Sequence, residues 1–240
     1  MGIFIWDTAP SKIFVWDTEV SKVFVWDTQV RPTWWTPWAN TVAYYEFDNN
    51  LNDSSGNWHN MSWYNTPSYW TTADWANYAN FSGSNWTYYL NWFPYNPSAY
   101  TISFWMNYPS YSSGGAGVII DYWYADGSNI PLRVQDKGSK VDINSTSITP
   151  NPSTNAWHYY TISYSSGTAS VYLDGSSTWQ TFSAMAAGTG RLILWNEWGS
   201  SYHSYHAGRW KLSEFIIESK TRTAQEISDY YNQTKWNYWL

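Results

Sequence analysis

The sequence predicts an all-β fold with one short helix near the C-terminus and a small β-repeat segment at the N-terminus. From Thr41 onward, short runs that alternate apolar and polar residues are separated by turn residues at spacings of about ten, which is typical of a sandwich or a barrel. Aromatic residues make up 22% of the 240 residues, and charged residues make up only 12%. This composition excludes a coiled coil and a solvated acidic tail.

The N-terminal segment is a repeat with a period of ten residues. Its three copies, at residues 3–8, 13–18 and 23–28, each hold β-branched or aromatic residues followed by Trp-Asp-Thr. Each copy predicts a short strand that is closed by a turn. Prolines after the third copy break the pattern and indicate a linker. The predicted division is β repeats at 1–32, a linker at 33–40 and one domain at 41–240.

The regular elements of the domain are seven predicted strands and one helix. The strands with the clearest alternation are Thr41–Phe47, Tyr100–Asn107, Gly117–Tyr122, Trp157–Tyr164, Ala169–Leu173, Arg191–Leu194 and Lys211–Ile217. Thr223 and Glu226 have the spacing of a capping box, so a helix is predicted over about 223–233. Its apolar face, which should dock on the sheet, consists of Ile227, Tyr230 and Tyr231.

Charge and cysteine content exclude several classes of protein. A net charge of −6 and a pI near 5.0 argue against nucleic-acid binding, which needs a basic surface. No apolar run approaches the roughly 20 residues of a membrane span, so no membrane insertion is expected. The chain has no cysteine, which excludes disulfides and thiolate metal sites. Residues 2–30 lack a basic start followed by an apolar block, so we expect no signal peptide in them.

Six motifs follow one another in the domain. They are Ala43–Asn57, Tyr100–Trp105, Ala156–Tyr160, Val171–Gly175, Lys211–Ile217 and Thr223–Tyr231. In this order they resemble the laminin-G-like, concanavalin A-like domain over roughly residues 41–234. The resemblance implies a two-sheet antiparallel jelly-roll sandwich that acts as a carbohydrate- or protein-binding module on bacterial surface proteins or phage fibres. It also implies a location outside the cell, on a cell surface or on a virion. The N-terminal repeats are similar to short segments that precede such modules.

Tryptophan stands at several places where this family usually has a turn glycine. Asn or Asp is followed by Trp at 57–58, 74–75, 85–86 and 91–92, although such turns require a positive φ that a bulky residue adopts only at a cost. A genetic code that reads UGA as glycine, translated with UGA as tryptophan, would produce this pattern. We then expect Trp105 and Trp157, which match family tryptophans, to be core residues, and the doubtful tryptophans to be exposed or in loops. The doubtful positions are Trp6, Trp16, Trp26, Trp58, Trp63, Trp70, Trp75, Trp86, Trp92, Trp195, Trp198, Trp210, Trp236 and Trp239.

A second interpretation is that the tryptophans are genuine and bind a ligand. Aromatic faces stack on sugar rings, and exposed Trp and Tyr in loops are what a carbohydrate-binding surface uses. The candidate ligand-binding residues, which surround Gly199-Ser200, are Trp195, Trp198, Tyr202 and Tyr205. A third interpretation is that Trp and Tyr only pack the inner faces of the two sheets.

Neither a catalytic site nor a metal site is strongly indicated. Glu46 and Asp48 alternate as the carboxylates of related glucanases do, but Asn50 stands where a third acidic residue is needed, so we expect no enzyme. Laminin-G-like domains often hold one Ca²⁺, and the candidate ligands in this sequence are Asp53, Asn57 and Glu214. The alternative for the loop around Asp53 is a set of Asx turns that stabilise it.

Two functions from different classes therefore remain. The first is a non-catalytic module that binds a neutral glycan or a surface protein, since the net negative charge disfavours acidic polysaccharides. The second is a structural or assembly module of a fibre or surface polymer, without a soluble ligand. Self-association through the N-terminal repeat strands is expected under the second, because short unpaired strand edges accept further strands.

Overall fold

The computed structural model divides the chain into two units, Met1–Thr36 and Pro37–Leu240. It describes residues 23–25, 28–30, 39–63, 67–72, 76–82, 88–90, 98–108, 117–124, 132–136, 140–183, 190–194 and 209–238. In the first unit, β1 (Val23–Val25) pairs antiparallel with β2 (Thr28–Val30), so the described part of the third repeat is a hairpin. The first two repeats lie outside the described residues.

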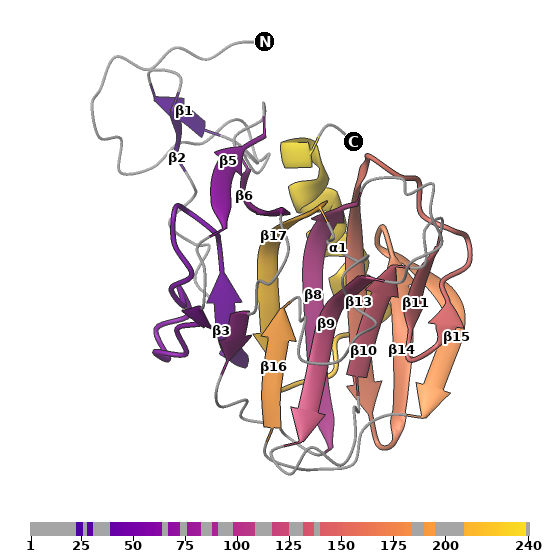
Figure 1. Ribbon diagram of the computed structural model, residues 1–240. Coiled ribbons are helices and arrows are strands. Elements are labelled where there is room, and N and C mark those ends of the chain that lie inside the picture. The colour runs from indigo at the N-terminus through magenta and orange to yellow at the C-terminus, as the bar shows by residue number, and fades with distance from the viewer. Residues whose placement is uncertain are drawn as a thin grey trace. The chain divides into compact units, whose positions relative to one another are not determined.

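The second unit contains two antiparallel sheets that face one another (Figure 1). Its strands are β3 (Thr41–Tyr45), β4 (Ser62–Trp63), β5 (Ser68–Thr71), β6 (Asn77–Ser82), β7 (Tyr88–Leu90), β8 (Ala99–Asn107), β9 (Gly117–Tyr124), β10 (Leu132–Asp136), β11 (Val141–Ile143), β12 (Thr146–Ser147), β13 (Trp157–Ser165), β14 (Thr168–Leu173), β15 (Ser176–Ser183), β16 (Gly190–Leu194) and β17 (Arg209–Glu218). The larger sheet has the order β15-β14-β13-β8-β17-β6-β5, with β3 also paired to β17, and the smaller has the order β12-β11-β10-β9-β16-β7-β4. The predicted jelly-roll-like sandwich is confirmed.

The predicted helix is also confirmed, as α1 (Ala224–Thr234), and a 3₁₀ helix, η1 (Lys235–Tyr238), continues it. Its capping box forms as the spacing indicates. The Thr223 hydroxyl accepts from the amide of Glu226 at 3.2 Å, and the Glu226 carboxylate accepts from the amide of Thr223 at 2.8 Å. Hydrogen bonds from the Lys220 ammonium and from Thr223 lower the pKa of Glu226 to about 2. The carboxylate therefore stays charged at the positive end of the helix dipole.

Strict alternation along β8 separates the two faces of the larger sheet. Tyr100, Ile102, Phe104 and Met106 belong to the apolar core between the sheets. The residues between them, such as Thr101, Ser103 and Trp105, are equally buried but lie on the opposite face. Because side chains on a strand alternate, the same nine residues serve two different layers.

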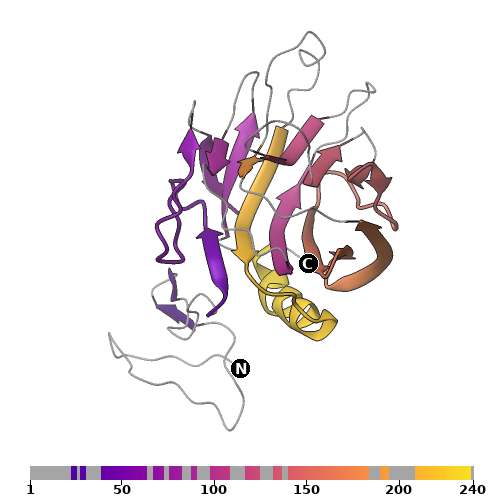
Figure 2. The ribbon, with the colours of Figure 1, turned by 90° about the horizontal axis from the view of Figure 1, so that it is seen from below.

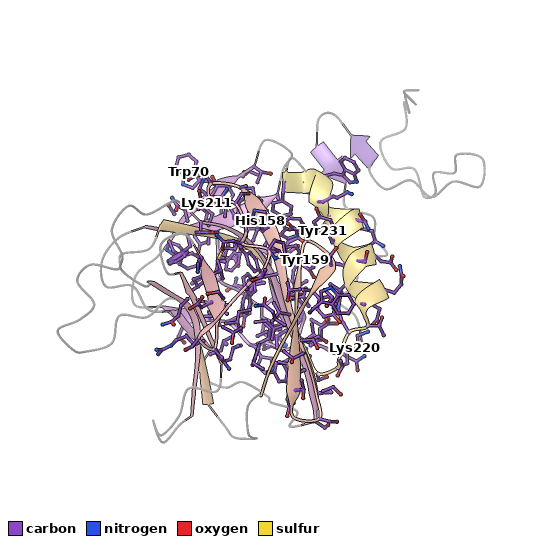
Figure 3. All side chains as sticks on the ribbon, turned by 90° about the vertical axis from the view of Figure 1, so that its right-hand side faces the viewer. Trp70, His158, Tyr159, Lys211, Lys220 and Tyr231 are labelled. Atoms are coloured by element: carbon purple, nitrogen blue, oxygen red, sulfur yellow. The ribbon has the colours of Figure 1, made fainter. Side chains whose placement is uncertain are left out.

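The outer layer is formed by α1 and η1, which cover the second face of the larger sheet (Figure 2). The Trp105 ring stacks on Tyr238 with centroids 4.1 Å apart and on Tyr231 at 5.7 Å. Its Nε1 donates to the Thr234 hydroxyl at 3.3 Å. Tyr159 lies 5.3 Å from the same ring, and Figure 3 shows Tyr159 beside Tyr231 of α1. Trp105 is therefore a core residue of this layer, as the sequence predicts.

The segment between β17 and α1 is held down by buried polar contacts. The Thr101 hydroxyl donates to the carbonyl of Lys220 at 2.8 Å, and the amide of Arg222 donates to the Ser163 hydroxyl at 3.1 Å. The Arg222 guanidinium pairs with Glu218, and both side chains are almost wholly buried. Burial raises the pKa of Glu218, and Arg222 partly opposes that rise. The ion pair thus allows a charged turn to lie beneath the start of the helix.

A close contact with the helix also explains the glycine of the Asp174-Gly175 hairpin. Both residues have positive φ, as a two-residue hairpin turn between β14 and β15 requires. A Cβ on Gly175 would lie 3.0 Å from two carbon atoms of the Tyr231 side chain. Gly167, in the hairpin between β13 and β14, has a positive φ but open space around it. The two glycines therefore separate the effect of backbone strain from that of packing.

We predict that Gly175→Ala lowers the free energy of unfolding by about 2–3 kcal/mol, because it adds a clash with Tyr231 to the strain of a positive φ. Gly167→Ala, which meets only the strain, should lose about 1 kcal/mol. Urea denaturation of both variants measures the difference. Equal losses would mean that the helix does not press on this turn.

We also predict that Arg222→Leu destabilises the protein by about 3–5 kcal/mol at neutral pH, because Glu218 is left buried without its partner. Burial raises the pKa of Glu218 above its ordinary value of 4.5 in the folded protein. This carboxyl therefore lowers stability as the pH rises above 4.5, and it costs nothing at lower pH, where it is protonated in both the folded and the unfolded protein. The loss should therefore shrink in acid. The double variant with Glu218→Leu should recover most of the stability in chemical denaturation, and a double variant as unstable as the single would contradict this account.

Candidate binding face

An aromatic strip on the outer face of the larger sheet extends from its β5 edge to η1. In the edge strand β5, Trp70 pairs with Tyr78 of β6, whereas Tyr69 turns inward and packs against the core. The Tyr78 ring lies 5.4 Å from that of Trp157, whose ring lies 5.1 Å from Tyr238. Trp157 and Tyr238 are buried, Tyr78 is half-buried and Trp70 is 60% exposed. One end of the strip, at Trp157 and Tyr238, is therefore held by buried contacts, and the other end, at Trp70, is accessible to solvent.

One cation lies over this strip. The Lys211 ammonium is 5.6 Å from the centroid of the Tyr78 ring. Trp70 and Lys211 appear at the same end of the sheet in Figure 3. Burial raises the pKa of Tyr78, so its hydroxyl stays protonated at neutral pH and can donate or accept a hydrogen bond. A planar aromatic face beside hydrogen-bonding groups is suited to a sugar ring, which has apolar faces and polar edges.

The predicted ligand-binding residues, Trp195, Trp198, Tyr202 and Tyr205, lie outside the described residues. They belong to the segment that connects β16 of the smaller sheet to β17 of the larger one. Their part in binding remains a prediction. The strip around Tyr78 was missed by sequence reasoning, because its members come from four separate segments of the chain.

The predicted metal ligands have other partners in the structure. The Asp53 carboxylate accepts from the amides of Tyr44, Ser55 and His59, each at 2.9 Å. The Asn57 amide donates to the carbonyl of Thr41 at 2.8 Å. The bond from Ser55 to Asp53 is an Asx-type contact that stabilises the loop.

Glu214, the third predicted ligand, lies on β17 where the strand bulges, with a positive φ. It is buried and accepts from the Tyr230 hydroxyl of α1 at 2.9 Å. Among the residues that the structure describes, no cluster of three or more His, Cys, Asp or Glu could hold a metal ion. Calcium binding therefore remains an untested prediction.

One further polar chain was not foreseen from the sequence. The Ser153 hydroxyl lies 2.8 Å from Nε2 of His158, and Nδ1 of His158 lies 2.7 Å from the Asp174 carboxylate. A serine, a histidine and an aspartate in this order form the pattern of an activated nucleophile. The other Asp174 oxygen accepts from the amide of Tyr159 at 2.9 Å. The amide of Asn155 donates to a carbonyl at 2.7 Å, so it is not free to stabilise an oxyanion.

The hydrogen-bonded series of Ser153, His158 and Asp174 has a structural role. Asp174 holds β13 to the hairpin between β14 and β15 from both sides, because its own amide also donates to the carbonyl of Tyr159 at 2.8 Å. His158 and Asp174 belong to two of the motifs that carry the family resemblance. Their contact follows from the pairing of β13 with β14, in which Tyr160 lies opposite Leu173.

No helix in the described part of the chain combines the length and apolarity of a membrane span. Among curated proteins, none matches the chain in sequence.

Several solved structures with a similar fold are described as binding domains. The botulinum neurotoxin serotype D binding domain has a TM-score of 0.60 and 16% identity, over 80% of this chain and 51% of that one. The botulinum neurotoxin type G receptor binding domain has a TM-score of 0.57 and 18% identity, over 81% and 51%. The binding domain of Paraclostridial Mosquitocidal Protein 1 has a TM-score of 0.62 and 16% identity, over 80% and 52%. The chain thus spans about half the length of these structures, and at such identities the likeness concerns the fold alone.

The sequence itself matches a family model. A laminin-G model, described as the concanavalin A-like lectin/glucanases superfamily, matches residues 76–228. This range runs from β6 to α1 and includes both long central strands, β8 and β13. The chain belongs to the concanavalin A-like lectin/glucanases superfamily.

Proposed function

We propose that this chain is a non-catalytic binding module of a bacterial or phage surface protein, located outside the cell, that recognises a neutral glycan or a surface protein. The observation that carries the proposal is the aromatic strip, with Lys211 above it, on the outer face of the larger sheet. The names of the similar structures describe binding domains, two of them from botulinum neurotoxins, which supports a binding role. The net charge of −6 favours a neutral ligand over an acidic one.

Binding at one site would be weak. A sugar ring that stacks on Tyr78 and forms a few hydrogen bonds in water gains about 1 kcal/mol from each contact. Useful avidity would then come from many copies on one surface. Trp195, Trp198, Tyr202 and Tyr205 are further candidates for contact with the ligand. A Ca²⁺ ion held by Asp53, Asn57 and Glu214 would need these side chains to exchange their present hydrogen bonds for the ion.

We predict that Tyr78→Ala and Lys211→Gln each weaken glycan binding about tenfold, because they remove the stacking face and the cation above it. Tyr172→Ala is the matched control, since Tyr172 is also half-buried on an outward-facing position of β14 but lies outside the strip. A neutral-glycan array followed by calorimetry, with and without EDTA, measures these effects. If Tyr172→Ala weakens binding as much as Tyr78→Ala, the strip is not the binding face.

The alternative is a structural or assembly module. It is favoured by the hairpin β1–β2, because a two-stranded sheet is marginal alone and can accept further strands at its edges. Absence of binding to every array glycan and surface protein, together with concentration-dependent self-association in sedimentation velocity, would support this function instead of the first.

The non-catalytic part of the proposal concerns Ser153. We predict that a fluorophosphonate probe leaves Ser153 unlabelled, because the neighbouring Asn155 amide is engaged and cannot stabilise an oxyanion. Intact-mass spectrometry of the treated protein measures this. Labelling that disappears in both Ser153→Ala and His158→Gln would instead identify a nucleophilic serine.

A further inference from the structure

Several tryptophans are exposed to solvent, whereas the other large apolar residues in the described part of the chain are buried or half-buried. Four large hydrophobic side chains are exposed in the described part of the chain, and all four are tryptophans: Trp58 (86%), Trp70 (60%), Trp179 (92%) and Trp236 (53%). No tyrosine or phenylalanine whose burial the structure describes is exposed. Since the chain has 22 Tyr and 9 Phe beside its 21 Trp, chance exposure of aromatics would have affected Tyr and Phe too.

Two of these tryptophans also have a backbone conformation that favours glycine. Trp58 has φ +63° and Trp179 has φ +60°. Other bulky residues share this conformation, but their side chains have compensating contacts. Phe47 is buried in the core, and Glu214 accepts a hydrogen bond from Tyr230. Trp58 and Trp179 carry the same strain with their rings almost wholly in solvent.

Neighbouring contacts impose the backbone at Trp58. On one side the side-chain amide of Asn57 donates to the carbonyl of Thr41 at 2.8 Å, and on the other the backbone amide of His59 donates to Asp53 at 2.9 Å. Both ends of the turn are therefore tied to β3 and to the loop centre. The residue between them has a positive φ, and its side chain is exposed and takes no part in these contacts.

The same holds at Trp179, in a bulge of β15. The Thr178 hydroxyl donates to the carbonyl of Val171 at 2.9 Å, and the Gln180 side chain accepts from the amide of Thr149 at 2.9 Å. The pairing of β14 with β15 shifts register at this place. A glycine with positive φ is the usual solution for such a bulge. The sequence alone did not mark this position as doubtful.

We propose that residues 58 and 179 are glycine in the protein as its source makes it, encoded by UGA codons that the source reads as glycine. Trp105 and Trp157 remain tryptophan, because both are buried and Trp105 stacks on two tyrosines of the outer layer. Trp210, one of the doubtful positions, is buried in β17, so the expectation of exposure is wrong there. Its indole nitrogen has no hydrogen-bond partner among the described residues.

The direct test is tandem mass spectrometry of the protein isolated from its source, on peptides that contain residues 57–59 and 177–181. Glycine at both positions, with tryptophan at 105 and 157 in the same sample, supports the proposal. Tryptophan at 58 and 179 overturns it. Tyr78 and Lys211 are unaffected by the codon reading, so the glycan test and this one can fail separately.

Stability gives a second readout on the chain as written. Trp58→Gly and Trp179→Gly should each raise the midpoint of thermal unfolding by about 2–4 °C, since glycine removes the strain and no contact is lost. Trp70→Gly is the control, because Trp70 is exposed but lies on a paired strand without a positive φ, where glycine lowers stability. If all three substitutions lower the midpoint alike, these tryptophans stabilise the turns and the proposal fails.

Discussion

The full-length antiparallel pairing of β8 with β13 is the constraint on which both layers of this protein depend. All nine residues of each strand are paired, from Ala99 opposite Ser165 to Asn107 opposite Trp157. A slip of β13 by one residue along β8 would turn Tyr160 out of the sandwich and place Thr161 inside it. The aromatic stacking of Phe104 on Tyr160, at 5.4 Å, opposes such a slip on the core side.

The other side of these strands explains why the fold needs its C-terminal helix. A layer of Thr, Ser, Tyr and Trp is too polar for a dry core and too apolar for water, so it needs a cover that offers both rings and hydrogen bonds. Tyr231 and Tyr238 supply the rings to Trp105, and Thr234 supplies the acceptor for its nitrogen. The helix, its capping box and the buried pair of Arg222 with Glu218 therefore act as one unit.

What the sequence can predict is what is encoded locally. Alternation predicts the long strands, and the spacing of Thr223 and Glu226 predicts the helix, because both signals lie within a few residues of each other. Strand β3 ends at Tyr45 rather than at the predicted Phe47, since Phe47 adopts a positive φ. The aromatic strip could not be predicted, because Tyr78 and Tyr238 both reach Trp157 only after β6, β13 and η1 have been placed together. The contact of His158 with Asp174 is hidden for the same reason.

The aromatic residues of this chain thus fall into two groups, which differ in whether other elements hold the ring in place. One group, which includes Tyr78, Trp105 and Trp157, is fixed by contacts from several elements, so its positions are consequences of the fold. The other, which includes Trp58 and Trp179, sits where turns and bulges demand a positive φ and no side chain. A binding surface needs rings whose orientation is held before the ligand arrives, since rigid contacts lose less entropy on binding. The first group meets that requirement, so the proposed binding face is the place where Lys211 lies over Tyr78 rather than the turns that hold Trp58 and Trp179.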